Sequence, residues 1–399
     1  MPEMISREHM LNMIAHRPSD HIPLYMRFWD VDLSSDVDNI PFEWRDQIKR
    51  VESTLPLQSP LGYVEEYIPV KLPGLRTRIE LLSTPAGSTP LLKKVYHIPE
   101  EPLQVVIKIT ADWPFGHQVP LFNDYNVPRF VEPLIKTTED LPKLKCLLAN
   151  PDQGALQTFK VEAKQLRRER DRLQVMLEGG WSALGDASVW LCGMERILYA
   201  QLLEPDFIEA LLDVIEWEMK RIDLLLEEEI DVLVYMAWYE GSDFWTPPVY
   251  RKMLKPRLAR MIARAPQKGV KFRYLISKGW KPIRHDLVEI GVDYLTNIDP
   301  VQDRIDLQEM KENIGDAISL IGGINSSVMI EQWGNEQIRE AVGRAIEALS
   351  PGRGFDLLPV DAVFTSQPWE KVQVIIDHWK NAVYQQISHL PAGLQEVIG

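Results

Sequence analysis

Two carboxylates lie in one short loop that follows a predicted buried strand. Glu240 and Asp243 belong to residues 239–245, directly after the apolar run 231–238, and the aromatic residues around them are Tyr235, Trp238, Tyr239, Phe244 and Trp245. A carboxyl group in apolar surroundings keeps its proton to a higher pH, so it can serve as an acid that assists a leaving group. Carboxylates in loops are also commonly solvated or cap a helix. The loop therefore predicts either an acid catalyst or a pair of structural side chains.

Three other polar residues lie within predicted strands or directly after them. Lys278 follows the run 270–277, where it could bind a substrate carboxylate or be an ordinary exposed lysine. Asn325 follows two glycines and could donate a hydrogen bond to a substrate oxygen, or serve only as a turn residue. Arg273 lies inside the run 270–277, where an unpaired charge is costly. We expect Arg273 either to bind an anion or to pair with a carboxylate of a neighbouring strand.

Aromatic residues follow two of the predicted strands. Tyr25, Phe28 and Trp29 belong to or follow the first apolar run, and Trp181 follows Gly179-Gly180. Such side chains could line an apolar pocket for an aromatic ligand. Packing in the core or at an interface is the alternative for most of the twelve tryptophans.

Strand-like and helix-like segments alternate along most of the chain. The predicted strands are residues 22–28, 173–180, 231–238, 270–277, 292–298, 318–321 and 355–360, and the helices include 7–15, 205–229, 282–290, 335–349 and 369–384. This alternation without hairpin turns predicts parallel strands with right-handed crossovers. A barrel needs an eighth strand, which could lie between residues 30 and 60 or in the insertion described next. A doubly wound sheet is the alternative.

One segment departs from this alternation. Between residues 62 and 130, short β-type runs at 63–70, 77–82, 91–97 and 105–109 are separated by proline and glycine. We predict a β-rich insertion there, which could act as a lid.

The composition excludes several classes of partner. The 399 residues are 45% hydrophobic and carry a formal net charge of −14. That charge argues against nucleic acid and against an anionic membrane surface. No apolar run reaches the length of a membrane span, and the N-terminus shows no signal peptide, so we expect a cytoplasmic protein. Cys146 and Cys192 form no metal or dithiol motif, and we expect both to be buried as small hydrophobes.

Several short segments, in their order along the chain, carry a family resemblance. Residues 16–23 read HRPSDHIP after a predicted helix, residues 83–88 read STPAGS, and residues 136–141 read KTTEDL. The shorter segments KPRL at 255–258 and GGIN at 322–325 also match. Together they resemble the uroporphyrinogen decarboxylase-like superfamily, nearest to its branch of corrinoid-dependent methyltransferases. The resemblance spans nearly the whole chain. It implies an α/β fold, a single (β/α)8 TIM barrel over residues 1–399, with the β-rich insertion after the first strand.

Two departures from the family pattern change what the resemblance implies. Uroporphyrinogen decarboxylases carry an Arg-Gln-Ala-Gly-Arg segment after the first strand, whereas residues 26–30 here read MRFWD and keep only Arg27. The thiol-activating methyltransferases carry a His-x-Cys-Gly zinc motif, whereas residues 276–279 here read ISKG. Zinc prefers thiolate and imidazole ligands. We therefore predict no Cys/His zinc site and no thiol acceptor, with Lys278 in the place of a metal ligand.

The resemblance then implies a methyltransferase subunit. It would move a methyl group from an O-methyl or N-methyl small molecule to the cobalt (cobalamin or a related corrinoid) of a separate corrinoid protein. The sequence does not determine the assembly, and a homodimer is the commonest arrangement of soluble homo-oligomers in general. A decarboxylase or lyase of a small acid, held by Lys278, Arg273 or Arg27, is one alternative, and a non-catalytic barrel is another. The predicted catalytic residues are Glu240, Asp243 and Lys278, and the predicted substrate-binding residues are Tyr25, Arg27, Trp29, Trp181, Tyr239, Arg273 and Asn325.

Overall fold

The structure is a computed structural model. It describes residues 7–18, 21–26, 54–57, 76–85, 87–98, 101–123, 127–148, 152–182, 184–216, 218–276, 278–360, 362–364 and 366–388. The chain divides into two compact units. The terminal unit comprises Met1–Pro56, Arg168–Glu178 and Gly269–Gly399, and the middle unit comprises Leu57–Arg167 and Gly179–Lys268.

Four parallel strands form the sheet of the terminal unit. They are β8 (Lys271–Leu275), β9 (Tyr294–Ile298), β10 (Ser319–Asn325) and β11 (Phe355–Val360), and they are neighbours in the order of the chain. Every residue of β9, β10 and β11 is buried. Strands that are buried on both faces are typical of a parallel sheet covered by helices.

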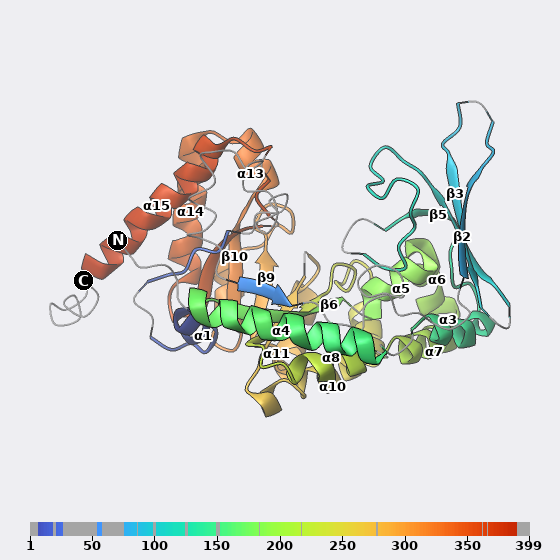
Figure 1. Cartoon of the computed structure of the whole chain (residues 1–399). Coiled ribbons are helices and arrows are strands. Elements are labelled where there is room, and N and C mark those ends of the chain that lie inside the picture. Colours follow the sequence, from blue (N-terminus) through green and yellow to red (C-terminus); the bar gives the residue numbers. More distant parts are fainter. Residues whose placement is uncertain are drawn as a thin grey trace. The chain divides into compact units, whose positions relative to one another are not determined.

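Helices follow these strands, and among them the predicted helices 282–290, 335–349 and 369–384 are present, whereas the two helices between residues 307 and 332 were not predicted. The helical elements are η4 (Lys281–Ile283), α11 (Arg284–Ile290), α12 (Leu307–Ile314), α13 (Ser327–Gln332), α14 (Asn335–Leu349) and α15 (Trp369–Ser388), and α1 (Arg7–Ile14) precedes the sheet. The helices α14 and α15 lie side by side (Figure 1). The apolar face of α14, which includes Ile338, Val342 and Ile346, is buried. In the described part of the chain, no helix is long and apolar enough to cross a bilayer.

The first predicted strand, residues 22–28, is wrong as a continuous strand. Residues 21–26 pair with β11 through a single parallel bridge between Leu24 and Leu357. The Tyr25 amide donates to the Leu357 carbonyl at 2.9 Å, and the Leu357 amide donates to Pro23 at 3.0 Å. Pro23 has no amide hydrogen of its own, so it cannot extend the ladder. A strand that the sequence left unplaced, β1 (Thr54–Leu57), lies within residues 30–60.

The middle unit holds β7 (Val232–Met236) and most of β6 (Met176–Ser182), which begins in the terminal unit. The predicted helix 205–229 is interrupted, because α7 (Pro205–Ile215) and α8 (Glu218–Leu226) are separate. The apolar spacing continues on both sides of the interruption, so periodicity alone could not show it. The other helical elements of this unit are η1 (Thr138–Asp140), α3 (Leu141–Leu147), α5 (Leu184–Cys192), α6 (Met194–Leu203), α9 (Pro247–Val249), η2 (Tyr250–Leu254), α10 (Lys255–Ile262) and η3 (Pro266–Lys268). The helix α4 (Gln153–Leu173) begins in this unit and ends in the terminal unit.

The β-rich insertion is an antiparallel sheet within the middle unit (Figure 1). Its strands are β2 (Arg76–Leu82), β3 (Leu91–His97), β4 (Leu103–Lys108) and β5 (Arg129–Glu132), paired in chain order. Three of the strands match predicted runs, and β5 was missed because it is only four residues long. The predicted run 63–70 lies outside the described residues.

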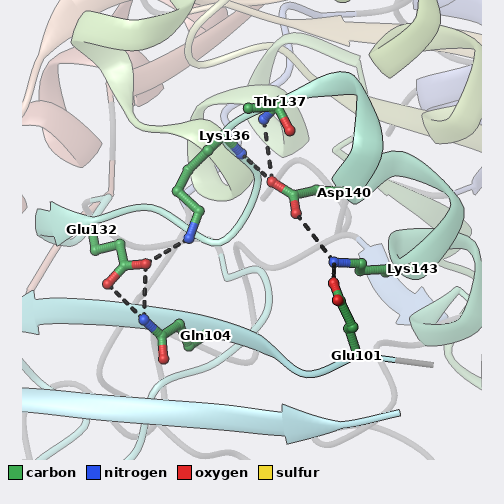
Figure 2. A network of polar contacts seen from close by, with 7 residues as sticks. All are labelled: Glu101, Gln104, Glu132, Lys136, Thr137, Asp140 and Lys143. Atoms are coloured by element: carbon green, nitrogen blue, oxygen red, sulfur yellow. Dashed lines mark hydrogen bonds and ion pairs between the residues drawn. The ribbon is translucent and has the colours of Figure 1, made fainter. Parts of the chain in front are cut away.

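Polar contacts connect this sheet to the helix that follows it (Figure 2). Glu132 of β5 accepts hydrogen bonds from Gln104 of β4 at 2.9 and 3.0 Å and from Lys136 at 2.5 Å. Asp140 accepts from the amides of Lys136 at 2.9 Å and Thr137 at 3.2 Å. The motif at residues 136–141 therefore has a structural function, since its aspartate accepts from two amides directly before η1.

One lysine of the insertion is buried. Lys94 of β3 is 4% exposed, and its ammonium group donates to the Val119 carbonyl at 2.5 Å and lies 4.9 Å from the centre of the Tyr96 ring. Burial lowers the pKa of Lys94 to about 7. The side chain therefore anchors the segment around residue 119 to the sheet.

This lowered pKa predicts a pH dependence of stability. Between pH 7 and 10.5, the unfolded chain binds a proton at Lys94 that the folded chain does not, so the free energy of unfolding should rise with pH. The variant Lys94→Met should lack this contribution. Denaturant unfolding at pH 6.5, 8 and 9.5 measures the free energy of unfolding of both proteins. The same change in free energy with pH for the two proteins would contradict the prediction.

The two cysteines differ in exposure, which corrects the expectation that both are buried. Cys146 of α3 is exposed and Cys192 of α5 is buried. Burial raises the pKa of the Cys192 thiol, and the reactive species is the thiolate. Ellman's reagent is therefore expected to titrate one thiol in the folded protein and two after denaturation. The Cys146→Ser protein should show no fast reaction, and rapid labelling of that variant would refute the assignment.

Candidate active site

A buried ion pair joins two strands inside the terminal unit. Arg273 of β8 is 5% exposed, and its Nη1 donates to both oxygens of Glu178 in β6, at 3.1 and 2.8 Å. Its Nε donates to Thr296 of β9 at 2.9 Å, and the Tyr294 hydroxyl donates to Glu178 at 3.0 Å. We call these four residues the Arg273 cluster. Of the two roles predicted for Arg273, the structure shows pairing with a carboxylate of another strand.

The neighbours of Arg273 fix its protonation state. Burial opposes the charge, but the attraction of Glu178 outweighs burial, and the pKa of Arg273 is raised. Burial and the Glu178 carboxylate raise the pKa of Tyr294 well above its ordinary value, so its hydroxyl remains a donor. Tyr25 is also buried and interacts electrostatically with Arg273. The cluster is therefore an interior scaffold whose cation is already neutralised.

A second carboxyl group faces the same cluster. Asp356 of β11 is completely buried, and the backbone amide of Tyr25 lies close enough to favour its ionised form. Arg273 lies close enough to favour its ionised form, but burial dominates and raises the pKa of Asp356 well above its ordinary value. Burial therefore favours the uncharged form of Asp356.

The loops at the carboxyl ends of these strands are held by hydrogen bonds. The Asn325 amide group donates to Asp299 at 2.7 Å and its oxygen accepts from the Val328 amide at 2.7 Å. The Gly279 amide donates to Asp303 at 3.3 Å, which connects the loops after β8 and β9. Asn325 is thus engaged at both ends of its side chain, while the neighbouring Lys278 is exposed. Barrel active sites are built from loops at this end of the strands.

The ladder between β9 and β10 is irregular at the same end. Its register shifts after Ile321, and Asn297 adopts a positive φ of 73°. The Nδ2 of Asn297 and the Oγ of Ser326 are buried, and no described residue bonds to either. Bulges of this kind are common beside active sites, and unpaired buried donors are rare in folded proteins. Both donors therefore lack a hydrogen-bond partner within the described part of the chain.

In the middle unit, Glu240 of the loop after β7 is completely buried, and its carboxylate faces the N-terminal end of α5. Its Oε1 accepts hydrogen bonds from the Tyr235 hydroxyl at 2.6 Å and from the Gly185 amide of α5 at 2.9 Å. In return, Asp186 of α5 accepts from the Tyr239 amide at 3.1 Å. Free amides at a helix N-terminus favour a carboxylate. Glu240 therefore holds the loop after β7 against α5, while Asp243 in the same loop is exposed.

Several predicted residues cannot be placed in the same way. Arg27 and Trp29 lie outside the described residues, and Trp181 lies in β6 but its side chain is not among those described. The sequence analysis missed Glu178, Tyr294, Thr296 and Asp356. Glu178 could have been recognised from the sequence, because an acidic residue in a buried strand needs a partner as much as Arg273 does.

Among the described residues, no group of three or more His, Cys, Asp or Glu side chains is placed to hold a metal ion. The predicted absence of a Cys/His zinc site stays a prediction.

Comparisons with known proteins identify the family and the fold. The family model for uroporphyrinogen decarboxylase (URO-D) matches residues 111–382, and a search of the curated proteins found no match. A methyltransferase from Methanosarcina mazei has a similar structure, with a TM-score of 0.60 and 16% identity over 94% of this chain and 98% of that chain. Two further structures are more distant. A D-psicose 3-epimerase matches with a TM-score of 0.36 and 8% identity, over 57% of this chain and 83% of that chain. An L-ribulose 3-epimerase matches with a TM-score of 0.33 and 14% identity, over 63% of this chain and 92% of that chain.

The predicted fold class is confirmed as an α/β barrel of the (β/α)8 type with a β-rich insertion. The family match covers well over half of the 399 residues. The chain therefore belongs to the uroporphyrinogen decarboxylase family.

Proposed function

We propose that this protein is a methyltransferase that moves a methyl group from an O-methyl or N-methyl small molecule to the cobalt of a separate corrinoid protein. The observation that carries the proposal is the similarity to a methyltransferase along nearly the full length of both chains. A reduced corrinoid supplies a strong cobalt nucleophile when the partner presents it. This chain then has to bind the methyl donor, orient its methyl group outward and assist the departing heteroatom.

The residues at the strand ends suit the binding of a neutral donor. Asn297 and Ser326 carry buried hydrogen-bond donors without charge, and Tyr25 is a buried aromatic residue of the same unit. Lys278 and Asp243 are exposed and could contact polar groups of the donor or the partner protein. Glu240 would act by positioning the loop that carries Asp243 and Tyr239, since its Oε1 already accepts two hydrogen bonds.

Decarboxylation of a small acid is the second candidate, because it is the reaction for which the family is named. It requires a cation that can hold the substrate carboxylate. Arg273 is already paired with Glu178, since its buried Nη1 donates to both carboxylate oxygens, so it is a poor candidate. Lys278 and Arg27 would remain for this task, which weakens the decarboxylase proposal without removing it.

The test mixes the full-length protein with cob(I)alamin, or with its native corrinoid partner, and a panel of methoxylated and N-methylated compounds. Cobalt alkylation is followed by absorbance, and release of carbon dioxide is measured with a parallel panel of small carboxylic acids. We expect alkylation with one class of donor. Carbon dioxide without alkylation would establish the decarboxylase, and neither product with a competent partner would indicate a binding protein.

A further inference from the structure

The strand β2 forms an exposed edge of the antiparallel sheet in the middle unit (Figure 1). It pairs with β3 along all seven of its residues without a register shift, and no other described residue bonds to its backbone. Five of the seven residues are exposed. An edge of this kind presents a row of free amide and carbonyl groups, which can pair with a strand of another chain.

This strand lacks features that prevent edge strands from pairing. It contains no proline, its pairing with β3 shows no bulge, and the apolar side chains of Ile79 and Leu81 are 41% and 58% exposed. Their neighbours in β3, Lys94 and Leu92, are buried. Ile79 and Leu81 therefore continue the buried face of the sheet to its edge, where one further strand would cover them.

The charged side chains of β2 are complementary to those of a second copy of the same strand. Arg78 and Glu80 lie on one face of the sheet, and Nε of Arg78 is 2.6 Å from a carboxylate oxygen of Glu80. Ile79 is the central residue of the strand. An antiparallel pair with a two-fold axis at Ile79 joins all seven residues and places Arg78 of each copy opposite Glu80 of the other. Each of the four charges then has neighbours of opposite sign.

The adjacent registers are less favourable. Paired residues have to point to the same face of the sheet, so the two-fold axis passes through a residue position. An axis at Arg78 would place two arginines opposite each other, and an axis at Glu80 would place two glutamates opposite each other. Like charges in this position destabilise a pair of strands. The sequence of β2 thus favours one partner, a second copy of itself, in one register.

We propose that β2 is a dimerisation surface through which two copies of this chain join their antiparallel sheets into one continuous sheet. Ile79 lies opposite the partner's Ile79, and Leu81 lies opposite the partner's Thr77. The outward backbone groups of β2 gain hydrogen-bond partners, and two pairs of opposite charges form across the interface. The proposal is independent of the methyltransferase function.

Cysteine crosslinking tests the register. All variants carry Cys146→Ser, which removes the exposed thiol, while Cys192 is buried. Ile79→Cys should form an intermolecular disulfide under mild oxidation, because directly opposite residues of an antiparallel pair have Cα atoms about 4.5–5.5 Å apart. Glu80→Cys alone should crosslink at least about tenfold more slowly, since its own copy lies on the diagonal. A mixture of Arg78→Cys and Glu80→Cys should form a mixed disulfide, which mass spectrometry identifies.

Charge reversal tests the complementarity of the two copies. Arg78→Glu places like charges opposite each other twice in the interface, so the dissociation constant of the dimer in sedimentation equilibrium should rise at least about tenfold. The double variant Arg78→Glu, Glu80→Arg restores alternating signs and should return to within about threefold of the unchanged protein. Arg339→Glu is the matched control, since it disturbs an exposed pair with Glu336 outside β2, and should leave the dissociation constant unchanged.

Each contrary result overturns the proposal. An unchanged protein that stays monomeric up to its solubility limit would do so, as would a dimer that tolerates Arg78→Glu or a double variant as weak as the single one. Equal crosslinking of Ile79→Cys and Glu80→Cys would contradict the register. Hydrogen exchange needs no substitution, and the amides of β2 should exchange more slowly as the concentration of the unchanged protein rises. Rates that do not depend on concentration would exclude this interface.

Discussion

Replacing Arg273 with methionine is expected to lower the free energy of unfolding by about 3–5 kcal/mol. Arg273 is 5% exposed and is the only cation that the described residues place against Glu178. Methionine has a similar length but no charge, so the Glu178 carboxylate would remain buried without its partner. Denaturant unfolding followed by circular dichroism measures the loss.

Two controls show whether the buried pair is the cause. The double variant Arg273→Met, Glu178→Gln removes both charges, keeps an acceptor for the Tyr294 hydroxyl, and should recover most of the stability. Arg339→Met removes an exposed pair with Glu336 and should cost about 0–1 kcal/mol. A double variant as unstable as Arg273→Met alone would refute this account of the cluster.

Replacing Gly322 with alanine is expected to cost about 3 kcal/mol or more. Gly322 has a φ of +145°, and a Cβ there would lie 2.6 Å from the backbone nitrogen and oxygen of Ile298. Neither atom can move without breaking the contact between β9 and β10. Because Gly322 precedes the end of β10 that carries Asn325, the variant should also lose methyl-transfer activity.

Gly269→Ala is the matched control. Gly269 also has a positive φ, +73°, but no atom lies within 4 Å of the position a Cβ would take. That variant therefore carries the backbone strain without the steric clash and should cost about 1 kcal/mol. Equal melting temperatures for the two variants would show that the close contact between the strands has no importance for stability.

Much of the fold could be predicted from periodicity and turn residues. The segments 91–97, 335–349 and 355–360 were predicted to the residue, since each combines one clear period with clear ends. The segment 22–28 failed because an apolar run does not reveal how many of its amides find a partner in the neighbouring strand.

The site was harder to predict, because its interactions join distant parts of the chain. Arg273 could be recognised as a buried charge, but its partner Glu178 is 95 residues away and only the strand arrangement brings them together. Glu240 was recognised by its aromatic surroundings, yet its bond to the Gly185 amide depends on where α5 begins. The burial of Asp356 beside Arg273 could not be predicted, because a single acidic residue in an apolar run does not show which residues surround it.

The most direct test of the central claim follows the methyl group itself. A donor identified in the absorbance screen is prepared with a fully deuterated methyl group and incubated with the protein and the corrinoid partner, and the corrinoid is analysed by mass spectrometry. The account predicts a methylated corrinoid that carries all of the deuterium, together with the demethylated donor in equal amount. Recovery of the labelled methyl group in unchanged donor, or in a product that has lost carbon dioxide, would contradict it.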